Sequence, residues 1–118
     1  MSELPSARVP APTTAFADLP WETLAPGLRQ KRAPGARWIE HRPEHVETEW
    51  CEKAHRGVLL DGELELEWRD GTRTVLVAGD ALAIDAGADH AHRGHVRDGQ
   101  RALIFLVEAD GLDERPVG

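Results

Sequence analysis

The sequence predicts an all-β protein, a small sandwich or barrel built from short strands. Turn signals such as Pro34-Gly35, Asp61-Gly62 and Asp70-Gly71 recur about every 8 to 12 residues, with short extended segments between them. No segment keeps a helical apolar period for longer than about two turns. The chain has 118 residues and a hydrophobic content of 41%, which suffices for one core. We therefore expect a single domain.

The two ends of the chain differ in composition from its middle. Residues 1–20 are rich in proline, alanine, serine and threonine, a composition that does not form a core of its own. We predict a flexible N-terminal tail here, which Phe16 or Leu19 could anchor. The barrel is expected over residues 21–110, and residues 111–118 are expected to form a C-terminal tail.

The clearest strand is predicted at residues 63–68, where apolar residues alternate with three glutamates. Leu64, Leu66 and Trp68 share one face, because side chains two apart in a strand point the same way. The glutamates then form a solvated face. The Asp70-Gly71 turn predicts a hairpin that leads into residues 72–77.

Two further strands are predicted at residues 81–84 and 101–107. The second is apolar throughout and is therefore placed in the interior. The residues expected to supply the barrel core are Leu64, Leu66, Ile84, Leu103 and Phe105.

Composition and charge exclude several classes of protein. The net charge is −7 and the basic residues form no stripe, which argues against nucleic acid or an anionic membrane as partner. The chain has one cysteine, so an intrachain disulfide framework is excluded. There is no apolar stretch of about 20 residues and no secretory signal pattern. A cytoplasmic location is expected.

Groups that bind transition metals or exchange protons gather in two segments, residues 49–55 and 87–92. If the first segment is a strand, Glu49, Cys51, Lys53 and His55 line one face of it. His90 and His92 likewise share the parity of a second strand. We expect the two faces to meet in one pocket, whereas His41, His45 and His95 are expected at the surface or the rim.

The second segment resembles the second motif of the cupin superfamily, which runs Gly, five residues, Pro, one residue, Gly, two residues, His, three residues, Asn. Gly79, Gly87 and His90 stand at the motif positions. Asp85 occupies the position where proline is usual, and Gly94 the position where asparagine is usual.

The first segment is similar to the first cupin motif, which runs Gly, five residues, His, one residue, His, three or four residues, Glu, six residues, Gly. The motif positions are counted back from Gly62, its closing glycine. His55 then stands at the glutamate position, and Glu49 and Cys51 stand at the two histidine positions. Pro43 replaces the opening glycine. The resemblance covers about residues 21–110 and is closest to small cupins that carry a Trp-Cys-x-Lys-x-His version of this motif.

The resemblance implies a cupin jelly-roll, a double-stranded β-helix barrel with a pocket inside, and a metal held by Cys51, His55 and His90 with Glu49. A thiolate and imidazole set favours Zn or Fe(II). Alternatives remain: Cys51 as a small buried apolar residue, Glu49 as the exposed start of a strand, and His92 as a ligand or as a partner that orients one. Candidate catalytic residues are Glu49, Lys53 and His92.

Two functions are compatible with an open pocket, and a third possibility, an inert structural dimer, would need the pocket to be filled by side chains. The first is a metal-dependent enzyme, an oxygenase or isomerase, that acts on a small polar molecule. The second is a module that binds or senses a small ligand or a metal without catalysis. Four tryptophans in a short chain and strand edges that need covering favour a homodimer.

Overall fold

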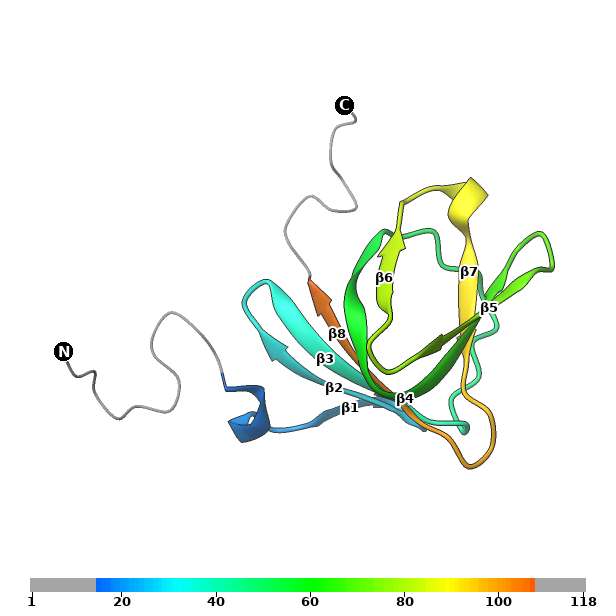
Figure 1. Cartoon of the computed structure of the whole chain (residues 1–118). Coiled ribbons are helices and arrows are strands. Elements are labelled where there is room, and N and C mark those ends of the chain that lie inside the picture. The colour runs from blue at the N-terminus through cyan, green and yellow to red at the C-terminus, as the bar shows by residue number, and fades with distance from the viewer. Residues whose placement is uncertain (1–14, 108–118) are drawn as a thin grey trace.

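The computed structural model describes residues 15–107, which form one curled, antiparallel sheet structure (Figure 1). In chain order the elements are η1 (Phe16–Asp18), β1 (Glu22–Ala25), β2 (Leu28–Ala33), β3 (Ala36–His41), β4 (His55–Trp68), β5 (Arg73–Val77), β6 (Ala81–Ile84), η2 (Ala88–His90), β7 (His92–His95) and β8 (Ala102–Val107). Within these residues the helices are two single 3-10 turns, as predicted. The predicted all-β fold is confirmed.

The long strand β4 joins the two sides of the barrel. Its first half lies between β6 and β8, and its second half lies between β5 and β7. The chain bends between the halves, where a bulge at Leu59–Asp61 interrupts the pairing with β8. Gly62 follows the bulge with φ +85°, and a Cβ there would lie 1.7 Å from the Arg101 carbonyl oxygen. Glycine is therefore required at this bend.

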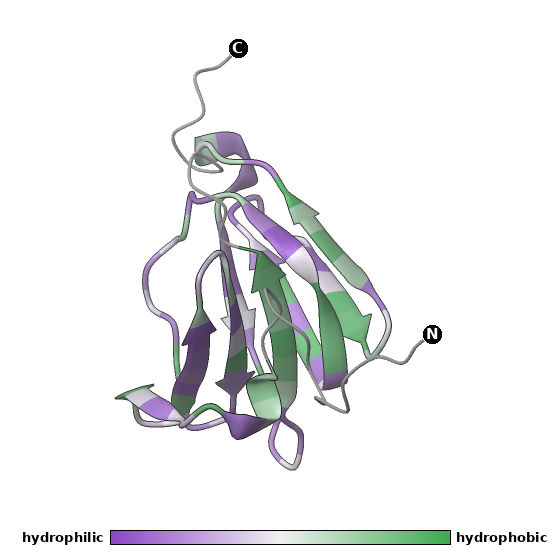
Figure 2. Ribbon diagram, turned by 90° about the vertical axis from the view of Figure 1, so that its left-hand side faces the viewer, coloured by the Kyte–Doolittle hydropathy of each residue, from purple (hydrophilic) through white to green (hydrophobic). Residues whose placement is uncertain are grey.

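The other strands extend the sheet from β8 in the order β8–β3–β2–β1. The barrel thus has β1, β2, β3 and β8 on one side and β5, β6 and β7 on the other, with β4 curving between them (Figure 1). Bands of apolar and hydrophilic residues alternate along the strands (Figure 2), which is the pattern of a sheet with one face turned inward.

The core lies inside this curl and contains Leu64, Leu66 and Ile84, as predicted. In β8, however, the predicted residues are wrong: Ala102, Ile104 and Leu106 face the core, whereas Leu103 and Phe105 are half-buried on the other face. An entirely apolar strand shows no alternation, so its sequence does not reveal which residues point inward.

The outer face of β3 and β8 is covered by the segment before β1. Phe16 stacks on Trp38 with ring centroids 5.2 Å apart and meets Phe105 edge-on at 6.0 Å. The predicted anchor at Phe16 is therefore present. The rest of the predicted N-terminal tail, residues 1–14, and the C-terminal tail, residues 111–118, lie outside the described residues.

No helix within residues 15–107 is long and apolar enough to cross a membrane.

The glutamates of β4 are less solvated than expected, because Glu63 pairs with Arg97, Glu65 with Arg73, and Glu67 with Arg93. The homodimer stays a prediction.

Candidate functional site

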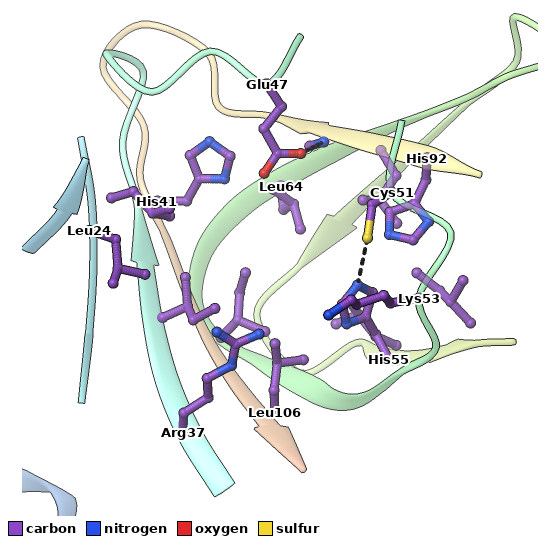
Figure 3. A pocket seen from close by; sticks show the side chains of 17 residues that line it. Leu24, Arg37, His41, Glu47, Cys51, Lys53, His55, Leu64, His92 and Leu106 are labelled. Atoms are coloured by element: carbon purple, nitrogen blue, oxygen red, sulfur yellow. Dashed lines mark hydrogen bonds between the residues drawn. The ribbon is translucent and has the colours of Figure 1, made fainter. Parts of the chain in front are cut away.

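The barrel has a partly open cavity of about 280 Å³ between its two sides (Figure 3). Leucine and isoleucine side chains form most of the wall, including Leu64, Leu66, Ile84, Ile104 and Leu106. The polar and charged side chains in the wall are Arg37, His41, Glu47, Cys51, Lys53, His55 and His92. A largely apolar cavity with a few polar groups is typical of a small-molecule site.

Three soft donor atoms meet at one side of this cavity. The thiol of Cys51 and one ring nitrogen each of His55 and His92 lie within 4.8 Å of one another. The Cys51 Sγ and His55 Nε2 are 3.5 Å apart (Figure 3). The rings of His55 and His92 pack edge to face with centroids 5.1 Å apart.

Backbone pairing between separate segments brings these residues together. Cys51 lies in the loop between β3 and β4, and its backbone exchanges two hydrogen bonds with His92, at 2.8 and 3.0 Å. His55 opens β4 and pairs with Ile84 of β6. The thiol is thus fixed by a strand-like bridge, although the loop itself is not a strand.

The orientation of the His92 ring is set by its own backbone neighbourhood. His92 is 4% exposed, and its Nδ1 lies 2.9 Å from the carbonyl oxygen of His90. A carbonyl oxygen only accepts, so Nδ1 carries the proton and donates it. In the neutral ring the lone pair is then on Nε2, the arrangement found in metal-binding histidines.

The two imidazoles favour ionisation of the thiol. Hydrogen bonds from His55 and then from His92 lower the pKa of Cys51 from 9.0 to about 6, against the opposing effect of burial. Burial lowers the pKa of His92, but its contacts with Cys51 and the His90 carbonyl outweigh this effect and raise it. At neutral pH the group therefore contains a thiolate, the form that binds metals.

The predicted site residues divide into two sets. Cys51, His55 and His92 come together, and Lys53 lines the same cavity. His90 does not join them: it is exposed in η2, and the 3-10 turn breaks the strand parity that was expected to point it inward. Glu49 is also exposed, because residues 49–54 form a loop and not the expected strand. Neither side chain lines the cavity.

Three polar or charged cavity residues, Arg37, His41 and Glu47, were not among the predicted site residues. Arg37, Ile39 and His41 alternate along β3 and all line the cavity, so the period of this strand was the signal that could have found Arg37 and His41. His41 is 3% exposed instead of lying at the surface, and burial lowers its pKa. Glu47 lies in an irregular loop, where no such period exists.

Residues 29–107 match the family model described as "Cupin domain". Among solved structures, the chain is similar to a sugar phosphate isomerase from a cupin superfamily of Silicibacter pomeroyi, with 17% identity and a TM-score of 0.64 over 81% of this chain and 74% of that chain. It is also similar to KdgF from Halomonas sp., with 19% identity and a TM-score of 0.56 over 80% of this chain and 93% of that chain. No curated protein matches the chain significantly.

Proposed function

The chain belongs to the cupin domain family, and from this premise we propose that it is a metal-dependent enzyme of the isomerase type that acts on a small, polar, negatively charged molecule. The cupin jelly-roll expected from the sequence is the fold of the molecule. The active site of the proposed enzyme is the cavity at Cys51, His55 and His92.

The convergence of three donors within 4.8 Å on the cavity wall carries this proposal. The donor set fits a divalent transition metal on chemical grounds. Cys51 offers a thiolate at neutral pH, and His92 presents Nε2 because its Nδ1 is committed to the His90 carbonyl oxygen. Thiolate and imidazole favour Zn or Fe(II) over the harder Mg or Ca. Three protein ligands would leave a position open toward the cavity, as in catalytic metal sites.

Two cationic side chains in the cavity wall, against the one carboxylate of Glu47, support an anionic substrate. Arg37 and Lys53 both line the cavity, and they come from different elements, β3 and the loop before β4 (Figure 3). A guanidinium binds carboxylate or phosphate oxygens in a planar, two-pronged way. The largely apolar wall around it strengthens these contacts.

The chemistry of an isomerase moves hydrogen between two adjacent carbon atoms, one of which starts as a carbonyl. A bound divalent ion would supply a Lewis acid that polarises the carbonyl oxygen. Lys53 would hold the substrate, donate a proton to that oxygen as it becomes a hydroxyl and take one back from the neighbouring hydroxyl as that becomes the carbonyl. The carbon-bound proton would pass to water in the cavity, and water would return one to the other carbon. The likeness to a sugar phosphate isomerase, a fold relative at 17% identity, favours this reaction class over an oxygenase.

Proton exchange with solvent deuterium tests the proposal. Protein purified without a metal-affinity tag is analysed for bound metal and incubated in D2O with a panel of sugar phosphates, sugar acids and uncharged sugars. The expected result is loss of a carbon-bound proton signal from one anionic member of the panel. Cys51→Ser and His92→Ala should abolish the exchange, and Lys53→Met should slow it.

The alternative function, binding or sensing without catalysis, gives a different result. It predicts stoichiometric metal and no exchange in any member of the panel. Protein without metal, together with full exchange activity in the Cys51→Ser variant, would refute the proposed site.

A further inference from the structure

A second cluster of metal-ligating side chains lies at another part of the cavity wall, apart from the Cys51 group. We propose that His41, His45 and Glu47 form a second site for a divalent transition-metal ion. One potential ligand atom of each residue lies within 4.8 Å of those of the other two. His41 and Glu47 line the cavity (Figure 3), so an ion held there would face the same bound molecule.

Backbone groups orient two of the three ligands. The Nε2 of His41 lies 3.3 Å from the carbonyl oxygen of His45, so Nε2 donates its hydrogen and the lone pair is on Nδ1. The Oε1 of Glu47 accepts a hydrogen bond of 2.7 Å from the Gly94 backbone. The second oxygen of Glu47, Oε2, lies 3.7 Å from His45 Nε2. Partners of this kind hold metal ligands in place in known sites.

The surrounding backbone fixes the loop that carries His45 and Glu47. Arg42 donates its backbone hydrogen to the Gly27 carbonyl oxygen at 2.8 Å, and His45 donates its own to the Arg42 carbonyl oxygen at 3.0 Å. A Cβ at Gly27 would lie 2.6 Å from the His45 nitrogen. The β1–β2 turn thus approaches the loop closely because residue 27 is glycine.

The lack of a side chain at Gly94 also lets His41 pack against β7. A Cβ at Gly94 would lie 3.4 Å from His41 Cε1, so glycine lets the imidazole lie against the strand that binds Glu47. The ring, the carboxylate and the strand therefore form one built arrangement.

The ligand types indicate which ions this second site would take. Two imidazoles and one carboxylate form a set that suits Zn²⁺, Fe²⁺ or Co²⁺ and lacks a thiolate. The Cys51 group contains a thiolate and no carboxylate, so the two sites differ in spectroscopic signature. The charge of Glu47 acts on His41 and also on His92, so the two groups are electrostatic neighbours.

Cobalt titration of the metal-free full chain separates the two sites. Thiolate-to-cobalt charge transfer in the near ultraviolet reports the Cys51 site, and equilibrium dialysis counts all bound cobalt. We expect two Co²⁺ per wild-type chain. Cys51→Ser should lose the charge-transfer band and keep one Co²⁺. Glu47→Gln should keep the band and lower the affinity of the other ion by at least about tenfold.

The glutamine of the Glu47→Gln variant can still accept the hydrogen bond from Gly94, so the loop should stay in place. Glu49→Gln is the matched control, because Glu49 is exposed two residues away and should leave both ions bound. His45→Ala should repeat the effect of Glu47→Gln. One Co²⁺ per wild-type chain together with the charge-transfer band, or equal second-ion affinity in the two glutamine variants, would overturn the second site. Absence of the charge-transfer band alone would count against the Cys51 site and not against this one.

Discussion

The Nδ1 of His92 donates a hydrogen bond to the carbonyl oxygen of His90 at 2.9 Å, so one histidine orients the other through its backbone. The side chain of His90 takes no part in this contact and is exposed. His92 presents Nε2 to the group formed with Cys51 and His55. The two histidines therefore make opposite predictions on mutation.

We expect His92→Ala to weaken metal binding and His90→Ala to leave it nearly unchanged. Loss of an outer partner of a metal ligand costs about 10- to 100-fold in affinity, so loss of the ligand itself should cost at least about 100-fold. Cobalt titration followed at the thiolate charge-transfer band measures this affinity. The alanine of His90→Ala keeps the carbonyl oxygen that orients His92. Equal losses in both variants would contradict this assignment.

The positions of these two histidines show what the sequence could predict. Strand segments with clear alternation, such as residues 63–68, were placed correctly, because a period of two fixes the inward face. Cys51 and His55 were identified as site residues, and the structure brings them together. The motif spacing favoured His90 over His92, but the 3-10 turn at Ala88–His90 shifts the residue that faces inward.

Other residues show where sequence reasoning loses its basis. Glu49 was expected inward because residues 49–55 were treated as a strand, whereas residues 49–54 are a loop held by the bridge from Cys51 to His92. Glu47 is positioned by a hydrogen bond from Gly94, 47 residues away. Such long-range contacts have no local signal in the sequence.

Gly62→Ala should strongly destabilise the barrel. Alanine at this φ of +85° carries backbone strain, and its Cβ would also lie 1.7 Å from the Arg101 carbonyl oxygen. Gly71→Ala is the matched control, because Gly71 has φ +92° with no atom within 4 Å of the added carbon. Strain alone costs about 1–2 kcal/mol, so Gly71→Ala should lose about that much and Gly62→Ala clearly more. Urea denaturation measures both, and equal losses would show that the β4 bend relaxes.

Glu40 should make the stability of the barrel sensitive to acid. This carboxylate is 1% exposed and pairs with Arg29 at 2.6 Å and Arg101 at 2.7 Å. Burial raises its pKa, but the hydrogen bonds and charges of Arg29 and Arg42 outweigh burial and hold the pKa below 4.5. A lowered folded-state pKa stabilises the fold above the unfolded-state pKa, and this stabilisation is lost as the pH falls through the folded-state pKa.

We therefore expect Glu40→Gln to lower the free energy of unfolding by about 1–3 kcal/mol at pH 7, since hydrogen bonds to a charged group are lost. The difference from wild type should shrink as the pH falls below 4.5. Glu52→Gln, which removes an exposed ion pair with Arg69, is the control and should cost well under about 1 kcal/mol. Denaturation curves at several pH values give both trends. A constant difference across the acid range would mean that Glu40 is not held ionised.

The thiol of Cys51 should react as a thiolate at neutral pH in the metal-free protein. Hydrogen bonds from His55 and His92 lower its pKa from 9.0 to about 6. The rate of iodoacetamide labelling should therefore rise with pH to a plateau with its midpoint near 6. His55→Ala removes the larger of the two hydrogen-bonding effects and should move the midpoint upward.

Addition of Zn²⁺ should then slow the labelling of Cys51 at constant pH, because a coordinated thiolate no longer attacks the reagent freely. Chelation should restore the rate. The His90→Ala variant should behave as wild type in both states, since its side chain lies outside the group. Equal rates with and without Zn²⁺ would show that Cys51 is not a ligand. The first metal site would then have to rely on His55 and His92 alone, and two imidazoles are too few for the proposed catalytic centre.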